Sequence, residues 1–501
     1  MTEILSRLAA RIDTATATPA RLLAACALWL AGLAWARPLS SPDETRYTDI
    51  PRWMVETGDW LVPRINGLPF VHKPPLYFWM EAVCIRLFGI GTLSARIPPL
   101  LAGILLCACV YALVRAFKGE HAARWSIAAL VFNPLLYGGA QYANMDLLVA
   151  SLITATLTAA VLATREADPR RERRLWLAAY AAAGLSVLAK GLIGIVLPGA
   201  VFVFYCLAAG QYRWLARAIS IPGLALLALI AAPWFILADR AAPGFLHHFI
   251  VVQHFARYTA GGFNNQFGPW FYPAVLAATM LPWTIASAPM WPALWRERGR
   301  KASLETLALV WLITMVVFFS IPRSKIVGYI FPALPAFAML AGPWIAARAD
   351  RRLTAAIGAS VCVLLVLAAT ILQPRGAQPA AAAVRALIGP ADTVVFHGRY
   401  FFDASLALNR RAPAYVVGDW SKRSDEMPDN VPRQLTEGRE FDGRSGFVLI
   451  DEAAFGVLAG QPGTIWVVMR GNPATPLPLA FAGFAIAASS DGNVILRRAN
   501  K

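Results

Sequence analysis

Acidic, basic and aromatic residues alternate in one stretch of the sequence, Ser41–Pro75, which lies between apolar segments. The stretch opens with Pro42-Asp43-Glu44-Thr45-Arg46-Tyr47 and closes with His72-Lys73-Pro74-Pro75. Ionisable groups are costly near a bilayer core, so a charged cluster held there predicts a functional site rather than a connector. Carboxylates could position a nucleophile or stabilise a reacting carbon, and neighbouring cations could stabilise the charge of a phosphate.

Further residues of the same chemical types lie in or beside other loops. They are acids, bases, histidines and a tyrosine: Asp49, Asp146, Lys190, Arg257, Arg323, Lys325, Tyr329, His247, His248 and His254. Tyr329 follows Lys325 by about one helical turn, so both side chains can point to one face. Lys190 has apolar neighbours on both sides and would be costly if unpaired, which favours a functional role. For Arg46, Arg323 and Lys325, interfacial anchoring remains an alternative to ligand binding.

The elements that must position these residues are mainly transmembrane helices. The chain has 501 residues, of which 58% are hydrophobic and 15% charged, as is typical of an integral membrane protein. Because about 20 apolar residues suffice to span a bilayer, we predict eleven spans: 21–37, 97–114, 123–139, 145–163, 174–189, 192–209, 217–237, 270–292, 304–320, 327–346 and 353–372. The first apolar run lacks a clean cleavage site, so it is expected to be a retained span.

Much of the formal net charge of +17 lies in alternate loops between these spans. The basic residues of these loops are Arg7, Arg11, Arg21, Arg115, Lys118, Arg124, Arg165, Arg170, Arg171, Arg173, Arg174, Arg213, Arg217, Arg296, Arg298, Arg300, Lys301, Arg348, Arg351 and Arg352. Positive loops face the cytoplasm, and eleven spans place all of them on one side. The charge therefore predicts membrane orientation rather than nucleic-acid binding, with the candidate residues and the C-terminus outside.

Two regions differ in composition, which predicts a transmembrane domain at 1–373 and a soluble domain at 374–501. Short β-branched runs in the second region predict strands at 393–397, 414–417, 447–450, 465–469 and 493–496, with helices at 380–387 and 402–408. This alternation predicts a small α/β layer domain. None of its glycines forms a phosphate-binding loop, and none of the six cysteines lies in it.

The first outer loop, residues 38–93, is expected to contain the catalytic residues. Within it, Tyr47–Thr57 and Leu76–Phe88 mix aromatic, apolar and charged residues. This mixture predicts two amphipathic helices that lie on the membrane surface.

These motifs resemble the aminoarabinose transferases (ArnT) and the wider family of polyprenyl-phosphate-sugar-dependent membrane glycosyltransferases, which is related to the protein O-mannosyltransferases. Besides the two ends of the Ser41–Pro75 stretch, the resemblance rests on segments that follow in the same order. They are Gly58–Pro63, Asn144-Met145-Asp146, Ala189-Lys190-Gly191, Val252–Tyr258 and Phe318–Ile321, followed by Lys325 and Tyr329. The resemblance covers the membrane part end to end and implies a helical bundle of the GT-C type. The C-terminal region resembles the family only in that a small soluble α/β domain follows the last span.

The resemblance implies an enzyme that transfers a sugar, aminoarabinose or a related amino sugar, from undecaprenyl phosphate to a lipid acceptor with inversion. The implied acceptor is a phosphate of lipid A, and the implied location is the periplasmic face of the bacterial inner membrane. In this family, such modification of lipid A is linked to polymyxin resistance. The implied catalytic residues are Asp43, Glu44 and Asp146. The implied ligands of the donor phosphate or acceptor are Arg46, Tyr47, Lys73, Lys190, Arg257, Lys325 and Tyr329.

Two positions depart from the family pattern. His72 stands where the family often has an acid before the Lys-Pro pair, and Phe70 replaces an aromatic hydroxyl two positions earlier. His72 and His254 could supply half of a divalent-metal site, although two histidines are more often structural. No cofactor is otherwise implied.

The role of Asp43 depends on the acceptor. A lipid phosphate is mostly ionised at neutral pH and needs little help from a base, so Asp43 would position the acceptor or stabilise an oxocarbenium-like carbon. A hydroxyl acceptor would instead need Asp43 as a general base.

Three other functions remain open from the sequence. A lipid or drug transporter would spread its charged residues toward the middle of the bilayer on both sides, whereas the unusual acids here cluster on one predicted face. A protein O-mannosyltransferase-like enzyme would share the Asp-Glu pair of the loop. The sequence does not indicate whether the C-terminal region binds a partner.

Overall fold

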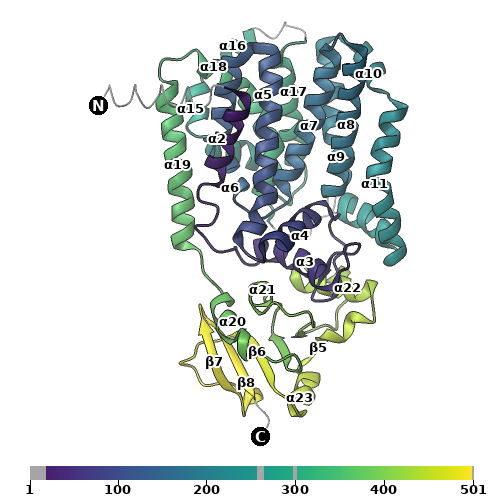
Figure 1. Ribbon diagram of the computed structural model, residues 1–501, viewed down its shortest axis with the longest axis vertical. Coiled ribbons are helices and arrows are strands. Elements are labelled where there is room, and N and C mark those ends of the chain that lie inside the picture. Colours follow the sequence, from purple (N-terminus) through teal and green to yellow (C-terminus); the bar gives the residue numbers. More distant parts are fainter. Residues whose placement is uncertain (1–17, 257–264, 297–301, 499–501) are drawn as a thin grey trace. The chain divides into compact units, whose positions relative to one another are not determined.

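The structure is a computed structural model that describes residues 18–256, 265–296 and 302–498 (Figure 1). Its contacts divide the chain into two compact units. Unit 1 comprises Met1–Ala36, Arg96–Pro233 and Asn265–Thr370, and unit 2 comprises Arg37–Ala95, Trp234–Asn264 and Ile371–Lys501. The outer loop thus belongs to the same compact unit as the C-terminal residues. The sequence of the loop did not indicate this association. The domain boundary after residue 373 stays a prediction.

Unit 1 is built from helices. They are α2 (Pro19–Ala31), α5 (Thr92–Val131), α6 (Pro134–Ala140), α7 (Asp146–Arg165), α8 (Pro169–Lys190), α9 (Ile193–Ala209), α10 (Tyr212–Ala218), α11 (Ile221–Ala241), α14 (Phe271–Thr279), α15 (Trp283–Ser287), α16 (Met290–Arg296), α17 (Leu304–Ser320), η2 (Val327–Ala333), α18 (Leu334–Ala346) and α19 (Arg351–Leu372). The last residues of α11 and α19 and the first residues of α5 are assigned to unit 2. Helices α7, α8 and α9 pack side by side (Figure 1).

Each of the eleven apolar segments is helical over most of its length, but fewer helices are long enough to cross a bilayer unaided. Among the described residues, five helices are long enough and apolar enough to cross a membrane. The number is six if α14 and the helices that follow it form one span that bends by 98°. The difference has physical causes. Two predicted spans are merged in α5, where Gly119 interrupts the helix with a φ of 82° that only glycine adopts easily. With 13 residues, α2 rises only about 20 Å, less than the roughly 30 Å hydrocarbon core.

The loop part of unit 2 contains two helices and a small hairpin. These are α3 (Asp43–Thr57), β1 (Arg64–Ile65), β2 (Leu68–Pro69) and α4 (Leu76–Phe88), and the segment before residue 257 adds α12 (Phe245–His247) and the π-helix η1 (His248–Ala256). Helix α3 begins with two acids, which suit the positive end of a helix dipole, and ends at Gly58 in the left-handed conformation. Residues Thr48–Met54 of α3 are buried in protein. The prediction that this helix lies on a surface is therefore wrong, whereas the bounds of α4 are as predicted.

The C-terminal part of unit 2 is an α/β structure. It contains α20 (Gln378–Val384), η3 (Arg385–Leu387), β3 (Thr393–His397), α21 (Phe402–Leu408), β4 (Tyr415–Val417), η4 (Ser424–Glu426), α22 (Val431–Phe441), η5 (Ser445–Val448), β5 (Leu449–Ile450), α23 (Glu452–Gly460), β6 (Ile465–Arg470), η6 (Leu479–Phe481), β7 (Ala485–Ser490) and β8 (Asn493–Arg498). The six strands form one sheet in the order β5-β4-β3-β6-β8-β7. Strands β3 to β6 are parallel and β7 and β8 are antiparallel to their neighbours.

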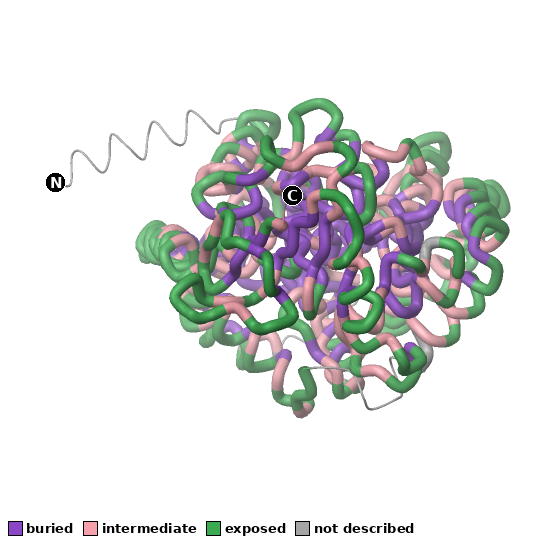
Figure 2. The backbone as a smooth tube through the Cα atoms, turned by 90° about the horizontal axis from the view of Figure 1, so that it is seen from below, coloured by how far each residue is buried: buried purple, intermediate pink, exposed green. Residues whose placement is uncertain are grey.

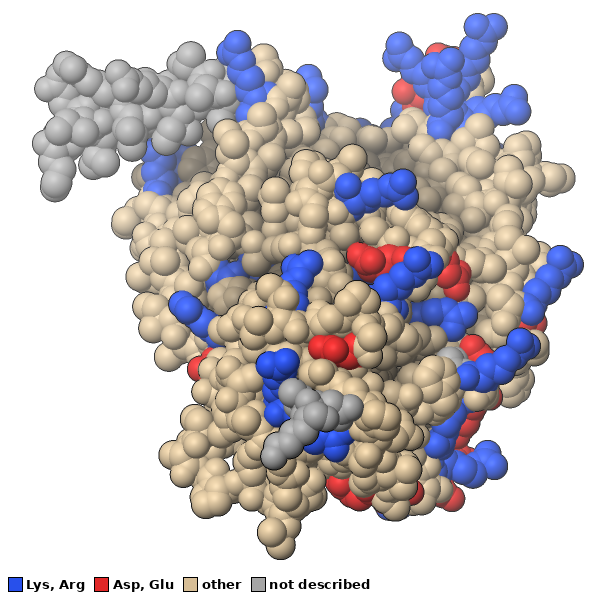
Figure 3. Space-filling model, turned by 60° about the horizontal axis from the view of Figure 1, so that its bottom comes forward, with Lys and Arg blue, Asp and Glu red and all other residues tan. Residues whose placement is uncertain are grey.

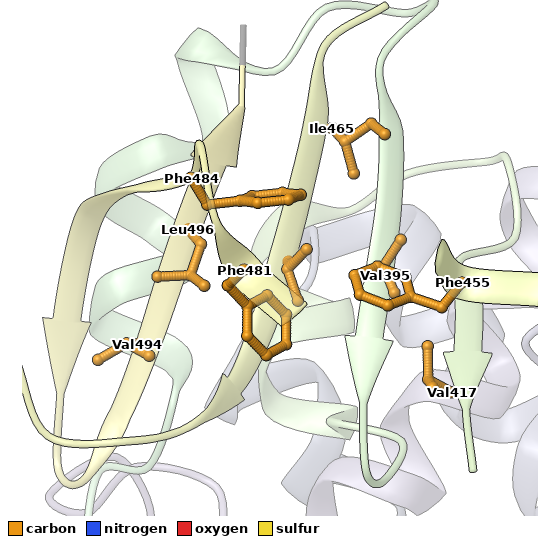
Figure 4. Packing of buried hydrophobic residues seen from close by; sticks show 9 residues of the cluster. Val395, Val417, Phe455, Ile465, Phe481, Phe484, Val494 and Leu496 are labelled. Carbon is orange, nitrogen blue, oxygen red and sulfur yellow. The ribbon is translucent and has the colours of Figure 1, made fainter. Parts of the chain in front are cut away.

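Alternate residues of the central strands form the core of this sheet. On one face, Val395 of β3, Val417 of β4 and Leu496 of β8 pack with Phe455 of α23 and Phe481 of η6 (Figure 4). Strands β3, β4, β6 and β8 are buried along most of their length, and exposed residues occupy the surrounding loops (Figure 2). The five predicted strand segments correspond to β3, β4, β5, β6 and β8. The edge strand β7 was missed because its Ala and Ser residues lack the β-branched pattern.

Candidate functional site

The basic loops of unit 1 lie together at one end of its helices. Arg165 at the end of α7 donates to the Ala116 carbonyl at 3.4 Å, and Arg217 of α10 pairs with Glu172 of α8 at 2.7 Å. Lys118 pairs with Glu305 at the start of α17, and Arg351 at the start of α19 lies 5.7 Å from the Trp125 ring. Lys and Arg side chains gather at this end, over α8 and α10 (Figure 3). The described parts of the loops that the charge argument placed on one side are therefore neighbours, whereas Arg7, Arg11, Arg298, Arg300 and Lys301 lie outside the described residues.

A buried ion pair lies at the opposite end of α7 and α8. Asp146 is the first residue of α7, and the amide of Asp146 is held at 2.8 Å by the Asn144 side chain. Lys190 is the last residue of α8 and contacts the Asp146 carboxylate, with 12% of the lysine side chain and 9% of the aspartate side chain exposed. The Lys190 ammonium also lies 4.2 Å from the centre of the Tyr329 ring. Three predicted site residues from three segments are thus in contact.

The segment around Tyr329 approaches Asp146 closely. A Cβ atom on Gly328 would lie 2.6 Å from Asp146 Oδ2, so only glycine fits there without moving the carboxylate. Tyr272 of α14 fixes the same segment, because its hydroxyl donates to the Ile326 carbonyl at 3.1 Å and accepts from the Ile326 amide at 3.3 Å. The sequence analysis did not single out Tyr272, which is one aromatic residue in an aromatic-rich stretch.

Lys325 lies next to this segment and is buried. Its ammonium donates to the Pro322 carbonyl, and only 1% of the residue is exposed. Burial lowers the pKa of this ammonium. Lys325 and Tyr329 do not point to one face of a regular α-helix as predicted, because η2 begins only at Val327 and is a 3₁₀-helix.

In unit 2, Asp43 and Glu44 stand side by side in sequence but differ in their surroundings. The Asp43 side chain is 54% exposed and pairs with Arg46 at 3.1 Å, one turn along α3. Glu44 is fully buried; its carboxylate contacts Arg37 and accepts from the Ser40 amide at 2.9 Å. Asp43 is therefore the acid that solvent can reach, and the contacts of Glu44 support the start of α3.

Tyr47 is buried against other rings of the loop. It stacks on Phe78 with ring centres 6.0 Å apart, and the Arg46 guanidinium lies 5.2 Å from its ring. In this structure Tyr47 therefore packs inside the outer loop, against Phe78 and the Arg46 guanidinium. Its predicted contact with substrate remains a prediction.

His72 and Lys73 follow the hairpin β1–β2. The His72 ring is buried, stacks on Phe70 at 5.1 Å and contacts the Glu437 carboxylate of α22. Burial alone would raise the pKa of Glu437, but the charge and hydrogen bond of His72 and a hydrogen bond from Arg433 lower it to about 2. Lys73 is half-buried. Phe70 thus packs on His72 at the position where the family often has an aromatic hydroxyl.

The predicted metal ligands are only partly described. His72 Nε2 faces Glu437, and the part of the chain that the structure describes contains no group of three His, Cys, Asp or Glu residues that could hold a metal ion. Nothing is described of the His254 side chain, and Arg257 lies outside the described residues. The metal site and the role of Arg257 stay predictions.

The site residues of the sequence analysis thus fall into two groups, one in each unit. Asp146, Lys190, Lys325 and Tyr329 belong to unit 1, and Asp43, Glu44, Arg46, Tyr47, His72 and Lys73 belong to unit 2. In each group a carboxylate pairs with a cationic side chain, Asp146 with Lys190 and Asp43 with Arg46.

Comparison with known proteins gives matches consistent with this chemistry. Residues 72–237 match the family described as dolichyl-phosphate-mannose-protein mannosyltransferase. The chain is 33% identical over 309 residues to undecaprenyl phosphate-alpha-4-amino-4-deoxy-L-arabinose arabinosyl transferase 1 of Sodalis glossinidius, covering 61% of this chain and 54% of the relative. It is 32% identical over 310 residues to the corresponding transferase of Aeromonas salmonicida, covering 61% and 55%. The matched part therefore spans about half the length of these curated relatives.

Among solved structures, ArnT from Cupriavidus metallidurans bound to undecaprenyl phosphate superposes with a TM-score of 0.82 at 24% identity, covering 95% of this chain and 97% of that structure. The chain has the ArnT fold. The predicted resemblance to the ArnT-like transferases is thereby confirmed. The ArnT fold extends through the C-terminal residues. In this region the sequence shared with the family only the expectation of a small α/β domain, without a common motif. The several long apolar helices make this ArnT-like chain a multi-pass membrane protein.

Proposed function

We propose that this protein is an inverting glycosyltransferase that moves an amino sugar, aminoarabinose or a close relative, from undecaprenyl phosphate to a phosphate of lipid A. The observation that carries the proposal is the buried Asp146–Lys190 pair against Tyr329, at the opposite end of the helices from the basic loops, in a chain with the ArnT fold. The curated relatives are named for an undecaprenyl-phosphate-linked donor of this kind.

In this reaction an acceptor oxygen bonds to the anomeric carbon while the bond from that carbon to the donor phosphate breaks. The bonding electrons leave with undecaprenyl phosphate, whose charge rises. Cations in a site with little water stabilise that charge, and losing one such donor typically costs about 10²–10³ in rate. We assign this role to Lys190, Lys325, Lys73, Arg46 and Arg257, with Tyr329 holding the ammonium of Lys190.

Asp43 is assigned to the reacting carbon or the acceptor. Its carboxylate is more than half exposed and its partner Arg46 is on the same helix, so it is accessible to substrate. Since a lipid phosphate is already ionised at neutral pH, Asp43 acts by charge and position, not by removing a proton. Glu44, which is buried with Arg37, keeps the first turn of α3 in place, and Asp146 neutralises Lys190 until the donor phosphate takes its place.

The membrane arrangement proposed for this activity has eleven spans, with the basic loops in the cytoplasm and the C-terminal α/β region in the periplasm. It is supported by the clustering of the basic loops at one end of unit 1, because positive loops remain on the cytoplasmic side. Cysteine labelling tests it cleanly, since the six native cysteines are buried. Ala167→Cys should react only after the inner membrane is permeabilised, and Leu479→Cys should react in intact spheroplasts. Labelling of both from one side would exclude this topology.

A second candidate function is transfer of a sugar from a polyprenyl phosphate to a protein hydroxyl, which the family match over residues 72–237 favours. A hydroxyl acceptor must lose its proton, so Asp43 would then act as a general base.

The direct test is mass spectrometry of lipid A from cells with and without the gene, followed by the purified protein with undecaprenyl-phosphate aminoarabinose and lipid A. A mass increase equal to one sugar per modified phosphate is expected. Sugar attached to a protein, with the mass of lipid A unchanged, would support the second candidate. Coupling between Arg46→Ala and Lys73→Ala in a double-mutant cycle then tests whether these two residues of unit 2 contact one donor molecule, since residues that share a partner give non-additive effects.

A further inference from the structure

One face of helix α22, in the C-terminal region, is occupied by contacts with the outer loop and with η1. The residues of this face are Gln434, Glu437, Gly438 and Phe441, followed by Asp442 at the end of the helix. Their spacing of three and four residues places them on one side of an α-helix. All of these contacts lie within unit 2.

Two of these residues contact the loop beside the side chains assigned to the donor phosphate. Gln434 Oε1 accepts from Arg46 Nη1 at 3.4 Å, and Arg46 is the partner of Asp43. Glu437 contacts His72, the residue directly before Lys73, and is itself held at 2.9 Å by Arg433 one turn earlier. The helix therefore holds both ends of the charged stretch that the sequence analysis singled out.

The remaining residues of the face hold the helix against the hairpin and η1. A Cβ atom on Gly438 would lie 2.7 Å from the Pro69 carbonyl oxygen and 2.9 Å from Leu68 Cβ, so the backbone of α22 touches strand β2 directly. Phe441 packs edge-on against the His248 ring at 5.4 Å, and Asp442 lies 3.6 Å from Arg64 of β1. The position of α22 is thus set relative to three segments at once.

A helix that only completed the C-terminal fold would be expected to direct apolar residues at its neighbours. Instead, α22 buries a glutamine and a carboxylate, and burial of polar groups is unfavourable unless they are hydrogen-bonded. Both find their partners in the loop. The two partners of such a contact are far apart in the chain: His72 and Glu437 are separated by 365 positions. The contacts can therefore form only when the C-terminal region has folded.

We propose that α22 is a positioning helix for the donor-binding residues of the loop, with Gln434 orienting Arg46 and Glu437 orienting the His72–Lys73 segment. This inference rests on the proposed function, because it assigns Arg46 and Lys73 to the donor phosphate. It gives the C-terminal region a role in donor binding that requires none of its residues to touch the substrate.

The test compares Gln434→Ala, Glu437→Gln and Gly438→Ala with the control Asp425→Asn. The Asp425 side chain is 68% exposed and contacts only its neighbour Arg423 among the described interactions. Because each variant removes or shifts a partner of a charged group, the KM for the undecaprenyl-phosphate sugar should rise about tenfold. The KM for lipid A should change less than twofold, and the control should match the wild type.

Rescue separates positioning from simple loss of folding. Glu437→Asp keeps the charge and should restore most of the donor affinity. The double variant His72→Gln, Glu437→Gln replaces the ion pair by an amide pair and should bind donor better than Glu437→Gln alone. If Glu437→Asp and Glu437→Gln are equally impaired for both substrates, or if donor KM does not change in any of the three variants, the proposal is wrong.

Hydrogen–deuterium exchange of the full-length protein in detergent gives a readout independent of activity. In Gln434→Ala and Glu437→Gln, exchange should accelerate in residues 43–47 and 70–75 and stay unchanged in α7 and α8. Unchanged exchange in the loop would overturn the positioning role. Faster exchange in the loop, together with a wild-type protein that fails to bind undecaprenyl phosphate, would instead refute the proposed function and leave the structural coupling in place.

Discussion

The Asp146–Lys190 pair and the Asp43–Arg46 pair contain similar chemical groups, yet the protein holds them in opposite ways. The first pair is buried and joins the ends of two packed helices. The second lies within one helix, with the Asp43 side chain 54% exposed, and is oriented from outside by Gln434. A buried pair is costly to break, whereas an exposed pair contributes little to stability. Unit 1 therefore holds a cation in a buried pair, and unit 2 holds an acid that is exposed to solvent.

The largest effect is expected from breaking the buried pair. Lys190→Met should destabilise the protein by about 3–5 kcal/mol, because it leaves the Asp146 carboxylate buried without its partner. Lys190→Met with Asp146→Asn should recover most of that stability and none of the transfer activity. Thermal unfolding and single-turnover transfer measure the two quantities separately. Equal stability of the single and double variants would show that the pair is not coupled.

The exposed pair should show the reverse pattern. Asp43→Asn is expected to reduce transfer by about 10²–10³-fold, while the free energy of unfolding changes by less than about 1 kcal/mol. Circular dichroism during heating and the rate of sugar transfer give the comparison. Full activity in this variant would remove Asp43 from the chemistry and leave Glu44 or Asp146 as the candidate acid.

A smaller effect is expected where the backbone approaches the buried pair. Gly328→Ala places a methyl group against the Asp146 carboxylate, and overpacking of this kind costs about 1–3 kcal/mol. Displacing the carboxylate should weaken donor binding about tenfold. Gly199→Ala, in α9, is the matched control, since a Cβ atom there meets nothing within 4 Å. Comparable affinities in the two variants would mean that the close approach at Gly328 does not matter for binding.

The smallest effects separate anion recognition from general surface charge. Arg46→Lys should impair donor binding several-fold, because lysine cannot grip two phosphate oxygens in the way that a guanidinium does. Arg411→Lys, at an exposed position of the C-terminal region, should change affinity by less than the error of the measurement. Isothermal titration with undecaprenyl phosphate in detergent compares them. If Arg46→Lys binds as tightly as the wild type, Arg46 makes no bidentate contact with the phosphate.

Local features of the sequence were sufficient to predict much of the fold. Each of the eleven apolar segments is helical over most of its length, α4 and α21 have the predicted bounds, and five strands of the sheet were recognised from β-branched runs. These predictions succeed because helix and strand preferences and apolar length depend on residues close together in the chain. The sequence analysis also predicted that the basic loops lie together, and contacts between their described parts agree with this.

Features that depend on distant contacts could not be predicted. Nothing in the sequence around Asp43 and Glu44 indicates that one carboxylate is exposed and the other is buried with Arg37. The pairing of Lys190 with Asp146, the close approach of Gly328 and the hydroxyl of Tyr272 on Ile326 also join segments that are separate in the chain.

The sequence by itself determined the chemical groups of this protein and the order of its apolar helices, because these depend on composition and local pattern. Only the tertiary structure decided which carboxylate has which base as its partner, and that the C-terminal helix α22 contacts both ends of the charged loop. The reason is physical: whether a charge is buried, paired or exposed is set by segments that meet only after the chain has folded.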